Sequence, residues 1–179
     1  MRALPSSEYF KLIYLNMNTP KLLLLLLSLI ALFLAGPVSD LFAIRTGEPL
    51  PEVVLPSLDG GYISLSNLEG RVIVLNFWAA WCAPCSKEIG ALNGLARVYK
   101  NDIAVIGITN DDPRTIRDFI RLQPIAYPVL LDSQSNIHKR FEVLEIPATF
   151  IVDRGGVLRK KYSGPVDIGE LGAVIESLL

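Results

Sequence analysis

The sequence predicts an α/β domain in which a central mixed β-sheet is flanked by helices, and three observations support this fold class. Residues 72–77, apart from Asn76, and 103–108 are apolar runs rich in β-branched side chains, which is typical of strands buried on both faces. Segments with helical character follow both runs, an order that favours parallel strands joined by helices. Residues 146–162 contain two further strand-like runs around a Gly-Gly turn, which predicts an antiparallel hairpin before a closing helix.

An apolar segment precedes this domain. Residues 22–35 are apolar except for Ser28, and the basic residues Lys21, Lys11 and Arg2 lie before them. Basic residues on this side of an apolar run predict a cytoplasmic N-terminus and an exported remainder of the chain. A uniform leucine run has no polar face, so we do not expect it to be a helix of the soluble core.

The division of the chain follows from this segment. We predict that residues 1–45 form a cytoplasmic N-terminus and a signal anchor, a single transmembrane segment. Residues 46–179 then form one domain on the outer side of the cytoplasmic membrane, facing the periplasm or the cell exterior. Because the run is shorter than the ~20 residues of a comfortable span, a cleaved signal peptide is the alternative. The poor cleavage sites at residues 33–35 and 41–43 favour an uncleaved anchor.

Composition excludes one function class and favours another. The formal net charge is −1 and no basic block is present, so we expect no nucleic-acid partner. The chain has two cysteines, Cys82 and Cys85, and their close spacing in an exported protein favours catalysis over stapling of the fold.

The elements of the domain are expected in a simple order. A stiff linker at 47–51 leads into a hairpin whose strands are 53–55 and 62–65, and a turn at 66–70 precedes the first buried strand. The expected helices are 86–99, one that begins near Pro113, 135–141 and 168–179; the remaining strands are 103–108, 127–132, 146–153 and 157–162.

The Cys-x-x-Cys motif lies between the first buried strand and the first helix. Cys82 falls at the helix N-terminus, where free backbone N–H groups and the helix dipole favour a thiolate. Cys85 is one turn further, close enough to form a disulfide, and Pro84 fits the first helical turn. The sequence therefore predicts a redox-active dithiol.

Three other interpretations of the motif compete with this one. A zinc site needs about four ligands, and His138 is the one further soft ligand that the chain offers. A structural disulfide across so short a loop would constrain little, because the entropic gain grows with loop length. Two inert buried thiols would not call for the flanking Trp81 and Pro84, which suit a shaped and partly exposed site.

The stretch Phe77-Trp-Ala-Ala-Trp-Cys-Ala-Pro-Cys85 resembles the active site of the thioredoxin superfamily. The wider pattern is similar to its membrane-anchored TlpA/ResA-like branch, which includes the cytochrome c maturation reductases. The resemblance implies a thioredoxin-like fold with an N-terminal β-hairpin extension. It also implies that Trp81, Ala83 and Pro84 contact the substrate, with Trp81 shielding the site.

The same resemblance assigns roles to residues outside the motif. It predicts a cis bond between Ile146 and Pro147 beside the cysteine pair, where a substrate chain could pair with the backbone of Ile146. It also implies that Glu88, one turn beyond Cys85, helps to titrate the pair. The chain departs from the family at Asn76, where thioredoxins have a buried aspartate, and at Ala148, where the cytochrome c maturation reductases usually have glutamate.

The predicted function is that of a thiol–disulfide oxidoreductase. Cys82 attacks a substrate disulfide and Cys85 resolves the mixed disulfide. By resemblance, the enzyme is a reductase of exported proteins, apocytochrome c among them, which needs no cofactor and receives electrons from a membrane thiol–disulfide partner. Cys82 is expected beside an open surface with a pKa below the ~8.5 of a free thiol, and the deeper Cys85 above it.

Two rival functions use the same fold. A copper-binding module of thioredoxin fold would favour wider cysteine spacing and a histidine near the cysteines. His138 lies among charged neighbours, and we expect it on the surface, remote from the pair. A peroxidase of the superfamily would have threonine three residues before its cysteine, where this chain has Ala79.

Overall fold

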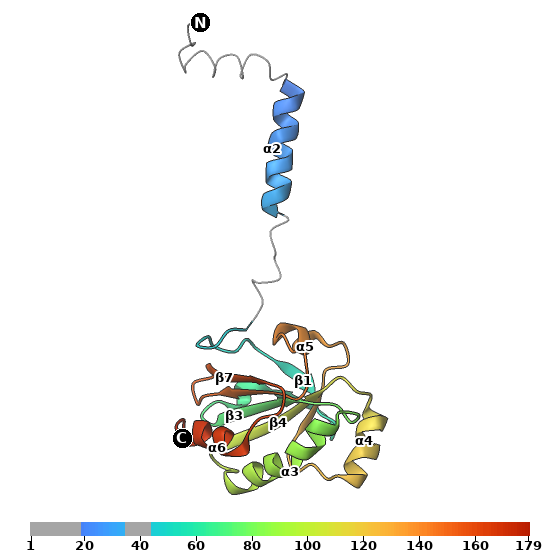
Figure 1. Ribbon diagram of the computed structural model, residues 1–179, viewed down its shortest axis with the longest axis vertical. Coiled ribbons are helices and arrows are strands. Elements are labelled where there is room, and N and C mark those ends of the chain that lie inside the picture. The colour runs from blue at the N-terminus through green and yellow to red at the C-terminus, as the bar shows by residue number, and fades with distance from the viewer. Residues whose placement is uncertain (1–18, 35–43) are drawn as a thin grey trace, which may run out of the picture. The chain divides into compact units, whose positions relative to one another are not determined.

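The computed structural model describes residues 19–34 and 44–179, and its contacts divide the chain into two units between Phe42 and Ala43. The first unit contains one described helix, α2 (Thr19–Leu34), shown in Figure 1. Its apolar side chains from Leu22 to Leu27, with Leu29 and Ile30, are all exposed within the chain. Among the described residues, no helix combines the length and the apolar character that crossing a membrane requires. Part of the predicted anchor lies outside the described residues.

The second unit is built on a five-stranded mixed sheet with the order β5-β4-β3-β6-β7 (Figure 1). The strands are β3 (Val72–Phe77), β4 (Ile103–Thr109), β5 (Val129–Leu131), β6 (Ala148–Val152) and β7 (Leu158–Ser163). Neighbours β3, β4 and β5 pair in parallel, whereas β6 pairs antiparallel with both β3 and β7. This is the mixed α/β sheet that the sequence predicts.

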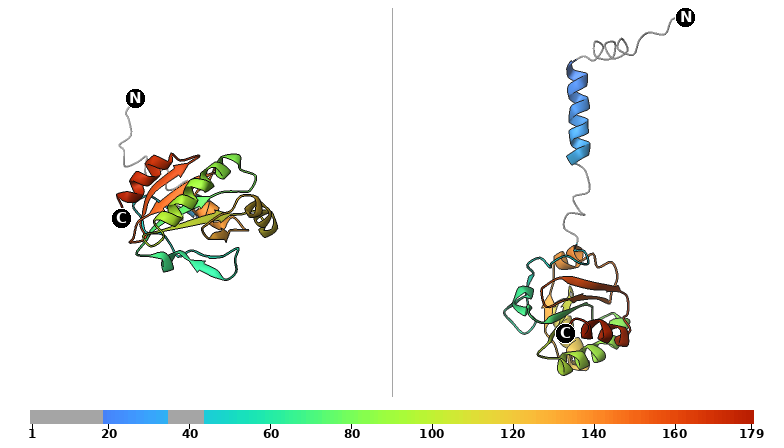
Figure 2. Two further views of the ribbon diagram at one scale, coloured as in Figure 1. Left: turned by 90° about the horizontal axis from the view of Figure 1, so that it is seen from below. Right: turned by 90° about the vertical axis from the view of Figure 1, so that its left-hand side faces the viewer.

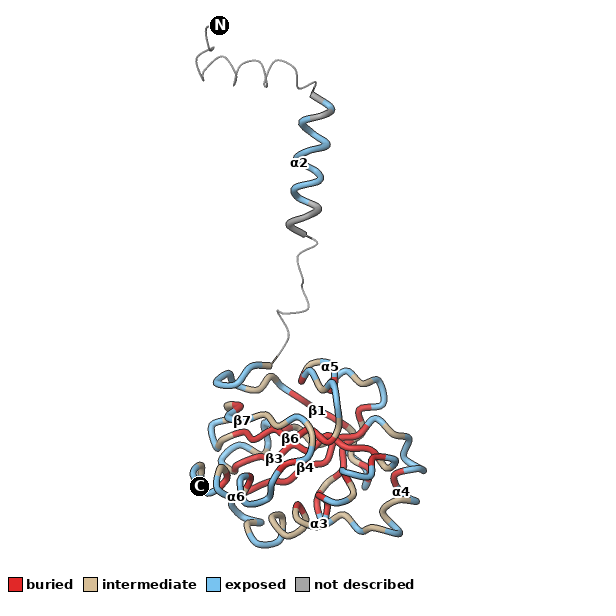
Figure 3. The backbone as a smooth tube through the Cα atoms, in the orientation of Figure 1, coloured by how far each residue is buried: buried red, intermediate tan, exposed pale blue. Residues whose placement is uncertain are grey.

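Strands β3 and β4 form the centre of the sheet because their residues are apolar on both faces. Every residue of both strands is buried, and Figure 3 shows these strands in red. Side chains alternate along β3, so that Val72 and Val74 point to one face and Ile73, Leu75 and Phe77 to the other. The two faces therefore nucleate two separate apolar clusters.

Helices cover both faces of the sheet, as Figures 1 and 2 show. On one face, α3 (Ala83–Val98) and α6 (Ile168–Glu176) contribute Leu92, Leu171 and Ile175 to the cluster with Val72 and Val74. On the other face, Phe141, directly after α5 (Asn136–Arg140), packs against Phe77. The remaining helix, α4 (Pro113–Leu122), begins at Pro113 with Asp112 as its N-cap residue.

A two-stranded antiparallel pair, β1 (Val54–Pro56) and β2 (Tyr62–Ser64), precedes the sheet at the position of the expected hairpin. Its connection attaches to the sheet edge, where the Leu58 N–H donates to the Val129 carbonyl oxygen at 2.9 Å. The expected turn that follows is a short 3₁₀ helix, η2 (Leu65–Leu68).

Candidate active site

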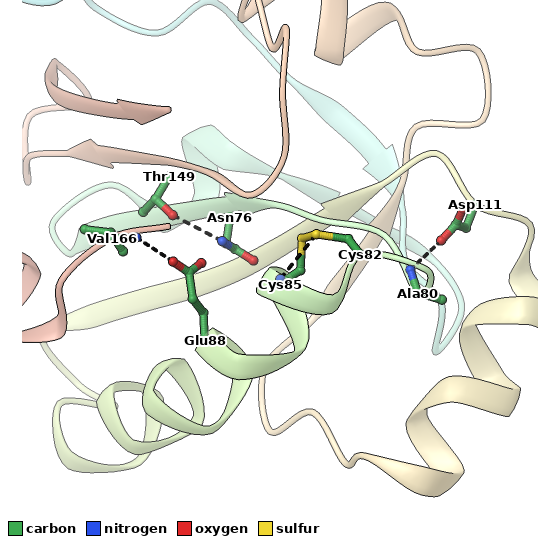
Figure 4. Close-up of a disulfide and its surroundings, with 8 residues drawn as sticks. All are labelled: Asn76, Ala80, Cys82, Cys85, Glu88, Asp111, Thr149 and Val166. Carbon is green, nitrogen blue, oxygen red and sulfur yellow. Dashed lines mark hydrogen bonds between the residues drawn. A yellow bond between two sulfur atoms is a disulfide. The ribbon is translucent and has the colours of Figure 1, made fainter. Parts of the chain in front are cut away.

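The two cysteines lie where β3 passes into α3. Cys82 is the N-cap residue of α3, Ala83 is the first helical residue, and Pro84 lies in the first turn. The structure holds Cys82 and Cys85 as a disulfide, with their Cα atoms 5.3 Å apart. The Cys85 backbone N–H donates to the Cys82 sulfur at 3.2 Å, as Figure 4 shows. An N–H aimed at this sulfur would stabilise a thiolate there once the disulfide is reduced.

The surroundings of the disulfide are apolar on the inside and exposed on the outside. Cys82 and Cys85 are 4% and 1% exposed, so the expected difference in exposure between them is small in the oxidised form. Ala83 and Pro84 are exposed beside them. Trp81, the expected shield of the site, is 74% exposed directly before Cys82. The exposed residues Trp81, Ala83 and Pro84 form the rim of the site, and a protein partner can approach the disulfide there.

The Ile146–Pro147 peptide bond is cis, as predicted. Ile146 packs against the apolar cluster that contains Cys82 and Cys85. Pro147 is buried directly before β6, and its carbonyl oxygen accepts the Gly164 N–H at 2.9 Å. The fold therefore brings the proline segment, distant in sequence, to the side of the disulfide.

Glu88 is a residue of α3, and its side chain is buried rather than exposed to solvent. Its side chain reaches toward the β7–α6 connection, where the Val166 N–H donates to Oε1 at 2.6 Å (Figure 4). The other oxygen, Oε2, is buried without a hydrogen-bond partner among the described residues. Burial raises the pKa of Glu88, against the lowering effect of the Val166 N–H and a weaker one from Asn76. A carboxyl group with a raised pKa, one turn from Cys85, is suited to exchanging a proton with a thiol.

The side chain of Asn76 links β3 to β6 near this carboxyl group. Its side-chain amide donates to the Thr149 hydroxyl at 3.1 Å, across the β3–β6 pairing in which the two residues are partners. Both side chains are buried. The amide is thus satisfied by a side chain rather than by the backbone, and we find a structural role for it.

The predicted surface position of His138 was wrong, whereas its predicted distance from the cysteine pair holds. The histidine is buried, 9% exposed, and its Nδ1 lies 2.6 Å from the carboxylate of Asp132, which also accepts the backbone N–H groups of Ile137 and His138. The ring packs edge-on against Phe77 at 5.0 Å between centroids. Burial opposes these hydrogen bonds, but together they hold the pKa of Asp132 below its usual value. His138 therefore belongs to the α5 side of the core, outside the cluster around the disulfide.

Two residues near the site could not be predicted from the sequence. Tyr127 is buried, its hydroxyl has no partner among the described residues, and burial, with the negative charge of Glu88, raises its pKa above the usual 10. The Asp111 carboxylate accepts the Ala80 N–H at 2.7 Å in the turn before Cys82. Neither carries a sequence signal, because each depends on contacts between distant segments. Within the described part of the chain, no group of three or more His, Cys, Asp or Glu side chains could hold a metal ion.

Comparison with known proteins identifies the class to which this fold and site belong. The profile of the AhpC/TSA family matches residues 46–161, and the chain belongs to that family. It is 28% identical to the thiol-disulfide oxidoreductase ResA of Geobacillus thermodenitrificans over 164 residues, covering 90% of this chain and 94% of the relative. It is 30% identical to the thioredoxin-like protein YneN of Bacillus subtilis over 132 residues, 72% of this chain and 77% of the relative.

Solved structures agree with this assignment. A thiol:disulfide interchange protein DsbE from Chlorobium tepidum superposes with a TM-score of 0.72 at 26% identity, covering 76% of this chain and 99% of the other. StoA from Bacillus subtilis superposes with a TM-score of 0.61 over 71% of this chain and 97% of its own, and at 23% identity it shows the fold alone. The resemblance to the thioredoxin superfamily and its ResA-like branch is confirmed. The chain is a thiol–disulfide oxidoreductase.

Proposed function

We propose that this enzyme reduces disulfides of exported proteins, with Cys82 as the nucleophile and Cys85 as the resolving thiol. One observation carries the assignment: Cys82 caps α3, its sulfur accepts the Cys85 N–H, and Ala83 and Pro84 are exposed beside it. Helix N-termini favour thiolates, and a substrate disulfide needs an open rim to approach the nucleophile.

The reaction balances over two exchange steps. The Cys82 thiolate attacks one sulfur of the substrate disulfide, and the other substrate sulfur leaves as a thiolate. Cys85 then loses its proton and attacks the Cys82 sulfur, which releases the second substrate thiol and leaves the Cys82–Cys85 disulfide. Glu88 is the proposed acceptor of the Cys85 proton. Two electrons pass to the substrate, and a dithiol donor must return two electrons to the enzyme.

The substrate class follows from the exposed rim and the proline segment. Trp81, Ala83 and Pro84 are exposed and mainly apolar. We propose that an extended substrate chain pairs with the backbone of Ile146 beside them. An unfolded cysteine pair on an exported protein, apocytochrome c for example, meets both requirements. The names of the relatives ResA and DsbE support thiol–disulfide exchange with a partner in general.

Trapping the mixed disulfide tests the proposal. Cys85→Ser should leave Cys82 linked to its substrate, because no resolving thiol remains, whereas Cys82→Ser is the matched control that should capture nothing. We expect adducts with exported proteins that reductant releases, and faster alkylation at neutral pH of Cys82 in Cys85→Ser than of Cys85 in Cys82→Ser. The reverse order of alkylation would exchange the two roles. If the wild type reduces neither insulin nor oxidised apocytochrome c, the proposed reductase function is contradicted.

We also propose that the N-terminal segment attaches the enzyme to the cytoplasmic membrane with the domain outside, where a membrane dithiol donor would reduce it. The exposed leucines of α2 support the attachment, and the basic residues before residue 22 support the orientation. Protease added outside spheroplasts should then digest the domain without lysis. Digestion only after lysis would contradict the proposed orientation, and release of the domain on washing would contradict the anchor.

A further inference from the structure

The turn at residues 79–82 places Cys82 at the N-terminus of α3, and a hydrogen bond connects this turn to the loop between β4 and α4. Within this turn, the Cys82 N–H donates to the Ala79 carbonyl oxygen at 3.1 Å. The N–H of Ala80 donates to the carboxylate of Asp111 at 2.7 Å (Figure 4). Among the described residues, this is the one hydrogen bond that a side chain makes to the backbone of residues 79–81.

The backbone around Asp111 is fixed on both sides. Its N–H donates to the hydroxyl of Thr109, a buried residue at the end of β4, at 3.2 Å. The next residue, Asp112, caps α4 by accepting the N–H groups of Arg114 and Thr115. The Asp111 carboxylate therefore extends from a rigid loop, and its role is separate from the helix cap that its neighbour provides.

We propose that Asp111 is a positioning residue for the nucleophile: by holding the Ala80 N–H, it keeps Cys82 at the N-cap of α3. This inference rests on the proposed role of Cys82. In the oxidised enzyme the disulfide itself tethers Cys82 to Cys85. After reduction that tether is gone, and the Asp111 bond becomes the side-chain contact that keeps the Cys82 sulfur aligned with the Cys85 N–H.

Charge and position act on the Cys82 pKa in opposite directions, which makes the two separable. A negative carboxylate near Cys82 disfavours its thiolate and raises the pKa, whereas alignment of the sulfur with the helix N-terminus lowers it. Asp111→Asn keeps an oxygen that accepts the Ala80 N–H and removes the charge. Asp111→Ala removes both.

The experiment follows alkylation of Cys82 against pH in the Cys85→Ser background, so that one thiol reports. The variants are Asp111→Asn, Asp111→Ala and, as a matched control, the neighbouring Asp112→Ala, which removes an equal charge and weakens the α4 cap. Glu88 and the other charged groups are common to all variants. We expect Asp111→Ala to raise the Cys82 pKa and slow alkylation at pH 7 about fivefold, the equivalent of one hydrogen bond of about 1 kcal/mol.

The expected order separates the proposal from two simpler explanations. Asp111→Asn should react as fast as the parent or faster, and Asp112→Ala should keep the parent pKa within about 0.3 units, a twofold change. If Asp111→Asn and Asp111→Ala lower the Cys82 pKa equally, the carboxylate acts by charge alone and the proposal is overturned. The proposal is also overturned if both variants leave the Cys82 pKa unchanged while the melting temperature falls, because Asp111 would then serve stability alone.

A second measurement needs no substitution. Hydrogen exchange in the oxidised wild type should show a protected Ala80 amide, because its N–H donates a hydrogen bond to the Asp111 carboxylate. Rapid exchange at Ala80 would show that its hydrogen bond to Asp111 is not maintained in solution, and the proposal would then be contradicted. This readout is independent of the reactivity of Cys82, so a failure of the proposed nucleophile and a failure of the Asp111 contact remain distinguishable.

Discussion

We expect the Glu88→Gln variant to be more stable than the wild type at high pH. The difference between their free energies of unfolding should grow as the pH rises. Burial raises the pKa of Glu88 above 4.5, so the folded state binds this proton more tightly than the unfolded chain does. Below about pH 4.5 both states hold the proton and the group carries no penalty. Between pH 4.5 and the raised pKa, the wild type loses stability as the pH rises, because folding then requires a buried charge or an extra proton. Glu88→Gln has no such dependence.

At acid pH, the hydrogen bond from the Val166 N–H determines how much each Glu88 substitution changes the free energy of unfolding. Glutamine still offers an oxygen to the Val166 N–H, so the two proteins should agree within about 0.5 kcal/mol where Glu88 is protonated. Glu88→Ala leaves that buried N–H without a partner and should cost about 1–3 kcal/mol at the same pH. At neutral pH the alanine variant should recover part of this loss, because it also removes the buried charge.

Urea unfolding of the three oxidised proteins from pH 4 to pH 8 measures these differences. The gap between Glu88→Gln and wild type at high pH gives the shift directly, at about 1.36 kcal/mol for each pKa unit. Glu69→Gln, at an exposed site, is the matched control and should leave the pH profile unchanged. A gap that is flat with pH, or that grows toward acid pH, would refute the assignment of a raised pKa to Glu88.

Further predictions concern the core around the site. Gly107→Ala should destabilise the domain by about 1–3 kcal/mol in urea unfolding, because the added carbon would lie 2.9 Å from the indole nitrogen of the fully buried Trp78. Gly94→Ala, in α3 with open space around it, is the matched control and should stabilise by about 0.5–1 kcal/mol. His138→Ala should cost about 1–3 kcal/mol at neutral pH and less in acid, where Asp132, whose pKa is lowered by hydrogen bonds, finally takes up a proton. A loss that stays the same once the pH falls below the pKa of Asp132 would contradict that pairing.

The sequence predicted the sheet because its signal is local. The run 72–77 coincides with β3, and 103–108 with β4 less its last residue, since a continuous apolar run of this length fits a buried strand. Element ends were less accurate. The helix expected over 86–99 begins at Ala83, and the last helix ends at Glu176 rather than at residue 179. Cap geometry and fraying decide these ends, and neither is visible in apolar periodicity.

The site was predicted where a motif carries it and missed where tertiary contacts create it. The disulfide between Cys82 and Cys85 follows from a short motif, and the cis bond at Pro147 from the resemblance to the thioredoxin superfamily. His138 was misplaced because its charged neighbours indicate a surface, whereas a short helix can turn one polar side chain inward when a carboxylate such as Asp132 receives it.

The position of the buried carboxyl group determines which part of the fold responds to its proton. In the thioredoxins that this chain resembles, the carboxyl group lies on the strand; here Asn76 occupies that strand and its amide is committed to Thr149. The carboxyl group lies instead on α3, the helix that carries both cysteines, and its partner is the N–H of Val166 before α6. Protonation of Glu88 should therefore act first on the contact between α3 and the β7–α6 connection, and more weakly on Asn76 of β3, whose side chain also lowers the pKa of Glu88. The dithiol and the carboxyl group share one helix, so a proton can move between Cys85 and Glu88 without a change in the position of α3.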